Sequence, residues 1–268
     1  MKRGKTLGIV IGVVNQKGGV GKTTTSVNIA AGLGALGKKV LLIDFDPQGN
    51  STTGFGVEKK SLEHTVYDVI TGEVRPEKAI IETKFKNVSI MPSTSKLCNA
   101  EPLLTQMEQK NLQLRKVVLQ IKDKYDIVLI DSLPSLGILA VNVLAACDTI
   151  IVPMTCEHFS LEGLAQLMVT IKKVRLKSNP NISIMGIVFT MLDKRLISSV
   201  EIKNEIKKSF NKNMIFHAEI PRNVRISEAQ SHGEPIIYFD KLSKGADAYM
   251  RLSKEILSKC RERVKEKV

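Results

Sequence analysis

Residues 15–24, Asn-Gln-Lys-Gly-Gly-Val-Gly-Lys-Thr-Thr, combine the residue types that bind phosphate. The backbone N–H groups of the glycines can close on phosphate oxygens because no Cβ stands in the way. Lys22 would bring a positive charge to the phosphates, and the Thr23 hydroxyl would be a ligand to Mg²⁺. The stretch therefore predicts a phosphate-binding loop, and a plain glycine-rich turn between two elements is its alternative. The predicted contacts are Gly18, Gly19, Val20, Gly21, Lys22, Thr23 and Thr24.

The residues on either side predict the two elements that such a loop needs. An apolar run over residues 9–14 is typical of a buried strand. A helix is indicated over residues 25–36, and Gly37 stands where a helix commonly ends. A loop between a strand and a helix places the phosphate at the helix N-terminus, where the helix dipole favours negative charge.

Two further predicted strands lead to aspartates. Residues 40–44 are an apolar run that ends at Asp44, with Asp46 just beyond it, and residues 126–131 end at Asp131. In an open parallel sheet, residues just past the carboxyl ends of the strands lie on the ligand side. Phosphates with Mg²⁺ need oxygen ligands and a group that orients the attacking water, so Asp131 is predicted to hold Mg²⁺ through a water. Taken alone, these carboxylates would also fit a solvated Asp-Pro turn and an ordinary strand end.

The rest of the chain alternates predicted strands and helices. Strands are predicted over residues 87–92, 149–153 and 182–190, and helices over residues 64–70, 100–124, 139–147 and 161–176. Repeated strand–helix units predict a parallel sheet that is covered on both faces. No linker, charge block or repeat divides the 268 residues. The expected fold class is α/β: a single P-loop domain over residues 1–268, with a mostly parallel twisted sheet, helices on both faces, and basic tails at 1–7 and about 261–268.

The composition argues against several other classes. Four widely spaced cysteines without a C-x-x-C pair argue against a zinc site and against a disulfide framework. No apolar run approaches the length that spans a membrane. The basic N-terminus leads straight into the first predicted strand, so a cleaved signal peptide would remove that strand. A soluble intracellular protein is expected.

Lys17 is the unusual residue of the loop, because it precedes the glycine pair while Gln16 stands where the standard pattern has glycine. The string Lys-Gly-Gly-Val-Gly-Lys-Thr-Thr resembles the deviant Walker A motif of the ParA/Soj partition ATPases and their MinD-like relatives. The resemblance implies ATP and Mg²⁺ as cofactors. It also implies that Lys17 and Lys22 are catalytic, and that Lys17 reaches across a dimer to the partner's nucleotide.

The segments that follow two of the predicted strands resemble the same family. Residues 44–50 resemble its second motif, in which the residue that matches Asp46 positions the attacking water and the one that matches Asp44 supports the magnesium site. Residues 132–137 resemble another family segment, with Leu133 where proline is usual. The metal site that the motifs imply consists of Thr23, Asp44 and Asp131.

Two segments in the C-terminal part, residues 190–193 and 220–225, resemble family segments that border the nucleotide base and the DNA-facing surface. The nucleotide contacts implied there are Pro221 and Asn223. The DNA contacts implied at or just beyond these segments are Arg195 and Arg225, followed by Arg222. The lysines at 203, 207 and 208 are weaker candidates that could simply be solvated.

Basic residues are concentrated toward the C-terminus. Residues 172–268 hold 21 basic and 11 acidic residues, so they account for +10 of the net charge of +13. A basic face attracts polyanions, among which nucleic acid is the commonest. A solvated lysine-rich surface is the alternative that composition alone leaves open.

The family resemblance implies a DNA-segregation ATPase. ATP binding would form a sandwich homodimer that binds double-stranded DNA of any sequence. Hydrolysis, stimulated by a ParB-like centromere-binding protein, would release the DNA. Such a protein would be cytoplasmic and associated with the nucleoid.

Other classes that share the loop need features of their own. A MinD-like membrane-associated ATPase that positions the division site needs a C-terminal amphipathic helix with bulky apolar anchors. Residues 261–268 have neither Trp nor Phe, so no membrane binding is expected. Iron–sulfur reductases with this loop need a cysteine directly after the strand that ends at Asp131, whereas the next cysteine here is Cys147.

Overall fold

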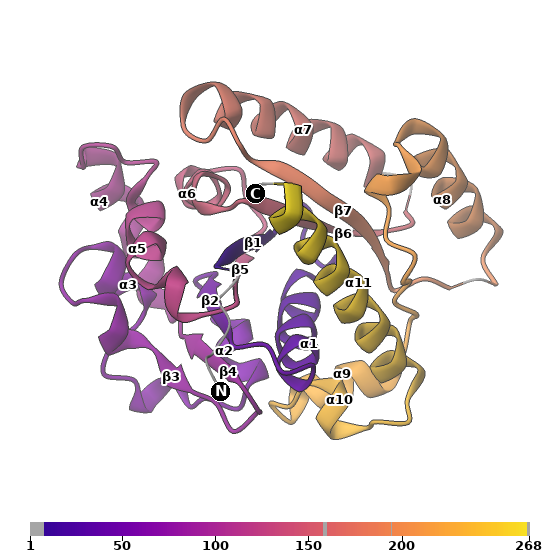
Figure 1. Ribbon diagram of the computed structural model, residues 1–268, viewed down its shortest axis with the longest axis horizontal. Helices are drawn as coiled ribbons and strands as arrows, with labels where there is room; N and C mark the ends of the chain where they lie inside the picture. The colour runs from indigo at the N-terminus through magenta and orange to yellow at the C-terminus, as the bar shows by residue number, and fades with distance from the viewer. Residues whose placement is uncertain (1–7, 158–159, 194, 267–268) are drawn as a thin grey trace.

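The computed structural model describes residues 8–157, 160–193 and 195–266, and their strands form one seven-stranded sheet (Figure 1). The strands are β1 (Ile9–Val13), β2 (Val40–Phe45), β3 (Ile81–Glu82), β4 (Val88–Met91), β5 (Ile127–Ser132), β6 (Thr149–Thr155) and β7 (Ser183–Thr190). Their order across the sheet is β3-β4-β2-β5-β1-β6-β7. Neighbouring strands pair in parallel except β3, which is antiparallel to β4 at one edge. The predicted fold class, one α/β domain with a mostly parallel sheet, is confirmed.

Helices cover both faces of this sheet (Figure 1). The α-helices are α1 (Lys22–Ala35), α2 (Asn50–Gly54), α3 (Val66–Ile70), α4 (Ala100–Gln106), α5 (Gln113–Ile121), α6 (Ile138–Ala146), α7 (Ser160–Lys177), α8 (Ile197–Ser209), α9 (Val224–Ser231), α10 (Ile236–Phe239) and α11 (Lys244–Glu266). Short 3-10 helices are η1 (Lys59–Ser61), η2 (Pro76–Ala79), η3 (Ser95–Asn99), η4 (Lys122–Lys124) and η5 (Lys212–Met214). One core lies between the sheet and α1, α9, α10 and α11, and the other between the sheet and α3 to α8.

The central strands are mostly apolar because both of their faces are covered. Every residue of β1, β2, β5 and β6 is buried. Successive side chains point to opposite faces of a strand. Val10 accordingly packs in the core with α3 to α8, whereas Ile11 packs in the core with α1 and α11. Near-continuous apolar runs are the expected sequence of strands in such a parallel sheet.

The strand register brings the predicted site residues to one edge of the sheet. Asp44 of β2 pairs with Asp131 of β5, and Val13 at the end of β1 also pairs with Asp131. The loop after β1 therefore begins beside both aspartates. This edge contains the carboxyl ends of the strands, where ligands bind in open α/β sheets.

Helix α1 begins earlier than its sequence pattern predicted. It starts at Lys22 rather than at residue 25, because Gly21 adopts a left-handed φ of 80° and turns the chain directly into the helix. Its other end agrees with the prediction, since Gly37 follows the C-cap residue Leu36 with a φ of 84°. The early start makes Lys22 the first residue of the helix, directly after the glycine-rich loop.

The helix expected over residues 100–124 is wrong as one element. The structure has α4 and α5 with a turn between them, in which Gln109 has a φ of 51°. Asn142 of α6 holds this region, because its Nδ2 donates to Lys110 O at 2.8 Å and its Oδ1 accepts from Leu114 N at 3.2 Å. The apolar spacing that suggested one helix instead reflects two short helices that pack on the same core.

Helix α11 is the longest helix and runs beside α1 (Figure 1). The two approach so closely that a Cβ on Gly32 would lie 2.2 Å from Ser253 Oγ. Near its C-terminal end, Arg263 donates to Ser183 Oγ and, at 2.7 Å, to Asp148 O. Residues 261–266 of the predicted basic tail are thus part of this helix, whereas residues 1–7 and 267–268 lie outside the described residues. Among the helices described, none has the length and apolar character needed to cross a membrane.

Candidate nucleotide site

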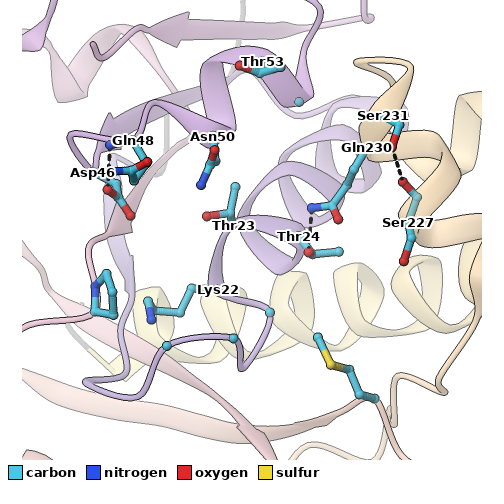
Figure 2. Close-up of a pocket in the computed structure, with 16 residues that line it drawn as sticks. Lys22, Thr23, Thr24, Asp46, Gln48, Asn50, Thr53, Ser227, Gln230 and Ser231 are labelled. Atoms are coloured by element: carbon cyan, nitrogen blue, oxygen red, sulfur yellow. Dashed lines mark hydrogen bonds between the residues drawn. The ribbon is translucent and has the colours of Figure 1, made fainter. Parts of the chain in front are cut away.

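A cavity of about 650 Å³ lies where the loop after β1 meets the turn after β2 (Figure 2). Its size is within the range of small-molecule sites. The loop, the start of α1, the residues after β2, the end of β7 and one face of α9 supply its lining. The lining residues that the sequence predicted are Gly18, Gly19, Gly21, Lys22, Thr23, Thr24 and Asp46.

The loop presents its glycines to open space. Gly19 has a φ of 73°, in the left-handed region that glycine adopts without a steric cost. A Cβ built on Gly18 or Gly19 would meet no atom within 4 Å. The loop is anchored by Asn15, whose Nδ2 donates to Pro153 O at 2.8 Å and whose Oδ1 accepts from Lys17 N at 3.0 Å. A ligand can therefore approach the backbone over a loop that is already fixed.

Lys22 lies buried at the bottom of the cavity and reaches back across the loop. Its Nζ donates to Lys17 O at 2.9 Å. Burial lowers the pKa of Lys22, and the carboxylates of Asp131 and Asp46 act against this shift. An ammonium group has three N–H donors. The contact with Lys17 thus leaves donors for the oxygens of a phosphate.

Asp46 lines the same cavity and has one oxygen that no described residue binds (Figure 2). Its Oδ1 accepts from Gln48 N at 2.9 Å, and its carbonyl accepts from Gly49 N at 2.9 Å. The turn is tight, since Gly49 has a φ of 59° and a Cβ there would lie 2.5 Å from Ser93 O. The carboxylate is held in place while Oδ2 can accept a hydrogen bond from water.

Asp44 and Asp131 are fully buried and lie behind the cavity rather than in its lining. Asp44 Oδ2 accepts from Thr52 N at 2.8 Å and from Thr52 Oγ1 at 2.7 Å. Asp131 accepts from Ser26 Oγ at 2.9 Å and from Ser51 Oγ at 2.8 Å. These bonds hold the start of α2 against the ends of β2 and β5.

Burial is the main cause of a raised pKa in both of these carboxyls. For Asp44, burial and then the nearby Asp131 raise the pKa to about 7, against hydrogen bonds from Thr52. For Asp131, burial raises the pKa to about 6, against hydrogen bonds from hydroxyls that include Thr23. Desolvation disfavours the charged form of a carboxyl, so a nearby cation would favour ionisation of both groups.

The residues at this edge fit a nucleotide with Mg²⁺. In proteins Mg²⁺ keeps several waters and uses one or two carboxylates together with substrate phosphates. Thr23 lines the cavity, and its hydroxyl acts on the pKa of Asp131 from close by, so the two could hold such an ion between the protein and a phosphate. Among the described residues, no cluster of three or more His, Cys, Asp or Glu side chains has the arrangement of a metal site. The open glycines and Lys22 supply what the phosphates need.

Lys17 points away from this cavity, although it belongs to the same loop. Its Nζ forms an ion pair with Glu157 just after β6, and this contact is the main cause of a lowered pKa of Glu157. Lys17 also lines another, smaller cavity of about 460 Å³ together with Leu136 and Gln166. The two lysines of the loop therefore occupy different places in the structure.

Helix α9 supplies site residues that the sequence reasoning missed. Ser227, Gln230 and Ser231 line the cavity, and Gln230 Nε2 donates to Thr24 Oγ1 at 2.7 Å (Figure 2). The other lining residues missed are Gln48, Asn50, Thr53, Gly54, Pro134 and Met191. A polar face at spacings of three and four is visible in the sequence of α9, but nothing local indicates that this face meets the phosphate loop.

Pro221, Asn223 and Val20 are predicted nucleotide contacts that do not line the cavity. Pro221 forms a parallel bridge with Leu192, and Asn223 is the N-cap of α9, where its Oδ1 accepts from Arg225 N at 2.8 Å. Val20 is buried, and its carbonyl accepts from Thr190 Oγ1 at 2.8 Å. Asn223 and Val20 thus bond to α9 and to the end of β7, where lining residues of the cavity also lie.

The two arginines first predicted to contact DNA are both held by carboxylates. Arg195 donates from Nε to Asp193 Oδ1 at 2.9 Å and from a second nitrogen to Oδ2 at 2.6 Å. These bonds lower the pKa of Asp193 to about 2. Arg225 donates from Nε to Asp240 Oδ2 at 2.9 Å and also pairs with Glu228. Both arginines remain exposed, so phosphates could compete for them.

The remaining basic candidates differ in their accessibility. Arg222 is exposed between the two arginines along the chain. The lysines at 207 and 208 are exposed on α8. Lys203 is not simply solvated, because its side chain is only 17% exposed and forms an ion pair with Glu219. Lys203 is therefore the weakest of these candidates for a contact with DNA.

Comparisons with known proteins place this chain among named relatives. A family model described as an AAA domain matches residues 8–184. The chain is 43% identical to the sporulation initiation inhibitor protein Soj of Bacillus subtilis (strain 168), over 93% of this chain and 98% of that protein. It is 42% identical to the chromosome partitioning protein ParA of Caulobacter vibrioides (strain NA1000 / CB15N), over 95% and 96% of the two chains.

Solved structures with the same fold include nucleotide-bound proteins. Cobyrinic acid a,c-diamide synthase from Mycobacterium smegmatis, with bound ADP and magnesium, superposes with a TM-score of 0.81 at 32% identity over 93% of this chain and 94% of that one. The cell division ATPase MinD of Pyrococcus furiosus has a TM-score of 0.79 at 28% identity, over 94% and 99%. Together with the phosphate loop and its aspartates, these relationships assign the chain to the Soj/ParA family of chromosome partitioning P-loop ATPases.

Proposed function

We propose that this protein is a DNA-segregation ATPase that binds ATP and Mg²⁺ in the cavity of Figure 2. The ATP-bound form is a sandwich homodimer that binds double-stranded DNA without sequence preference. Hydrolysis, weak in the protein alone and stimulated by a ParB-like centromere-binding partner, releases the DNA. The protein acts in the cytoplasm, on the nucleoid.

One observation carries the nucleotide part of this proposal: open glycines, Lys22, Thr23 and Asp46 converge on one cavity. Lys22 binds the phosphates nearest the reaction, where negative charge is greatest. Thr23 and Asp131 would hold Mg²⁺. Asp46 orients the attacking water through its available oxygen, and Asp44 supports the turn that carries Asp46.

The position of Lys17 supports its action across a dimer. Its side chain is partly exposed and lies outside the cavity that its own loop forms. In the proposed dimer it leaves Glu157 and contacts the phosphates of the partner's nucleotide. A cation supplied in this way stabilises the charge that develops in phosphoryl transfer.

The charge distribution supports the DNA part. Residues 172–268 carry +10 of the net charge of +13. Arg195, Arg222 and Arg225 are exposed on segments that follow β7 and begin α9. Contacts from such residues to phosphates provide affinity without sequence information. Dimerisation places two copies of this surface on one particle and thereby makes DNA affinity depend on ATP.

The direct test is DNA binding in two nucleotide states. The protein should bind two unrelated duplexes of equal length with similar affinity in ATP and Mg²⁺, and much more weakly in ADP and Mg²⁺. Light scattering on the same samples should show a dimer only with ATP. Equal DNA binding in both nucleotides would defeat the proposed switch, and strong preference for one duplex would defeat binding without sequence preference.

No contact with a membrane is proposed, in contrast to the MinD-like alternative. The apolar residues of α11, including Leu252, Ile256 and Cys260, are buried against the sheet. Arg263 then ties the helix to the start of β7. Sedimentation with anionic liposomes in ATP tests this proposal, and the protein should remain in the supernatant.

A further inference from the structure

Helix α9 turns one polar face to the nucleotide cavity. Ser227, Gln230 and Ser231 line the cavity, whereas Ile226 and Ala229 are buried in the core between the helix and the sheet. The spacing of three and four residues explains why the three polar side chains share a face. The helix thus forms a wall of the cavity that is distant in sequence from the phosphate loop.

The surroundings of α9 fix the position of this wall. Just after the helix, Ile236 N donates to Asn28 Oδ1 of α1 at 2.8 Å in a buried hydrogen bond. Gly233 packs so tightly on the end of α2 that a Cβ there would lie 2.9 Å from Thr53 O. Since α1 and α2 also border the cavity, α9 is held against the elements that form the rest of the site.

Gln230 is the residue through which α9 contacts the first turn of α1. Its Nε2 donates to Thr24 Oγ1 at 2.7 Å (Figure 2). A threonine hydroxyl that accepts this bond still has one proton to donate. In the described part of the chain, no protein acceptor takes this proton. The carbonyl four residues earlier, Val20 O, already accepts from Thr190 Oγ1 at 2.8 Å.

We propose that Gln230 is a positioning residue for nucleotide binding, whose amide fixes the Thr24 hydroxyl so that its proton is donated to a phosphate oxygen. This inference rests on the proposed binding of ATP in the cavity. A hydrogen bond to a charged oxygen is stronger than one between neutral groups. A hydroxyl that is already held also loses less freedom when the ligand binds.

Two substitutions and their combination test this role. Gln230→Met keeps the length and helix propensity of the side chain but removes the donor. Thr24→Val keeps the shape of the side chain but removes the hydroxyl. Gln120→Met is a matched control, because Gln120 is an exposed helical glutamine on α5 whose Nε2 donates to Lys116 O at 3.1 Å. The probe is a non-hydrolysable ATP analogue with Mg²⁺, and calorimetry measures its affinity.

Gln230→Met should weaken binding of the analogue about threefold to tenfold, the size of one hydrogen bond. In the Thr24→Val background the same change should have no further effect, because Gln230 acts only through that hydroxyl. Gln120→Met should bind as the wild type does. Thermal unfolding without nucleotide should give the same midpoint for Gln230→Met and Gln120→Met, which separates positioning from folding.

Two results would overturn this role while leaving the proposed function in place. One is wild-type affinity in Gln230→Met, and the other is an equal loss of affinity from Gln230→Met with and without the Thr24 hydroxyl. Failure of the wild-type protein to bind the analogue at all would overturn the proposed ATP site, and this inference with it.

Discussion

The nucleotide cavity and the surface that carries Arg195 and Arg225 hold their charged groups in opposite ways. Behind the cavity, Asp44 and Asp131 are fully buried, and each of their oxygens accepts a hydrogen bond from a hydroxyl or a backbone N–H group. At the surface, the arginines are exposed and are held by carboxylates on neighbouring turns, as in the pair of Arg225 with Asp240.

This difference separates a preorganised site from an adaptable surface. Groups that are fixed before the ligand arrives need not reorganise during the reaction, so the loss of one is costly. Exposed ion pairs contribute little and are screened by salt, so phosphates can displace them at low cost. Helix α9 belongs to both regions, because it carries Arg225 near its start and Gln230 near its end. Substitutions should therefore have large, salt-independent effects in the cavity and small, salt-dependent effects at the surface.

The largest effect on ATP binding is expected from Lys22→Ala. The substitution removes the buried ammonium beside the phosphates, so affinity for ATP should fall at least about a hundredfold. Equilibrium dialysis measures this loss. Lys116→Ala, which removes an exposed lysine on α5, is the matched control and should keep wild-type affinity. Tight ATP binding by Lys22→Ala would contradict the assignment of the phosphate loop.

Lys17→Ala should leave ATP binding intact but reduce steady-state turnover about a thousandfold, the effect of losing a cation that acts in trans. Binding survives because Lys22 contacts the carbonyl of Lys17 rather than its side chain. Glu157→Gln breaks the same ion pair but keeps the lysine, so it should retain turnover. An active, dimerising Lys17→Ala would exclude the proposed role.

Asp46→Ala should reduce turnover about a hundredfold, because the attacking water is no longer oriented. The phosphate contacts of the ground state do not involve this carboxylate, so ATP should still bind and the dimer should accumulate. Light scattering in ATP and Mg²⁺ detects the dimer, and phosphate release measures turnover. Normal turnover, or a monomer at saturating ATP, counts against this assignment.

The raised pKa of Asp44, about 7, predicts how stability depends on pH. The folded protein binds this proton more tightly than the unfolded chain, where the pKa is near 3.8. The ligand-free protein should therefore lose stability as the pH rises from about 4 to about 7. Over this pH range the midpoint of thermal unfolding should fall by a few degrees less in Asp44→Asn than in the wild type. If the thermal midpoints of the two proteins depended equally on pH, this result would argue against the raised pKa of Asp44.

The parts of the site that local sequence patterns specify could be predicted. The glycine-rich loop, the apolar run before it and the strands that lead to Asp44 and Asp131 follow from residue types and spacing alone. Their convergence also followed, because parallel strands place their carboxyl ends at one edge of the sheet. The sequence did not show that both aspartates are buried behind the cavity. The hydroxyl groups that bond to them there come from α1 and α2.

The wall formed by α9 could not be predicted, because it depends on packing between distant parts of the chain. Gln230 and Thr24 are in hydrogen-bond contact although they lie 206 residues apart in sequence. The turn between α4 and α5 was missed for a related reason. Apolar spacing continues across it, while the polar contacts that stop the helix come from Asn142 of another helix.

The smallest effects are expected for the surface arginines. Arg195→Ala/Arg225→Ala should weaken DNA binding in ATP about tenfold at low salt. It should also make the slope of log affinity against log salt shallower by about 0.9 for each DNA phosphate that the variant no longer neutralises. Asp240→Asn should instead raise the affinity for DNA about twofold, because it removes a carboxylate that competes with phosphate for Arg225.

The most direct measurement of the whole account is a salt titration of DNA affinity for the wild type and the Arg195→Ala/Arg225→Ala variant, each in ATP and in ADP. The wild type should bind DNA tightly and in a salt-sensitive way in ATP but weakly in ADP, and the variant should show a shallower slope in ATP. ATP affinity of the variant should equal that of the wild type, since neither arginine lines the cavity. Identical slopes in the two proteins, or identical binding in the two nucleotides, would contradict it.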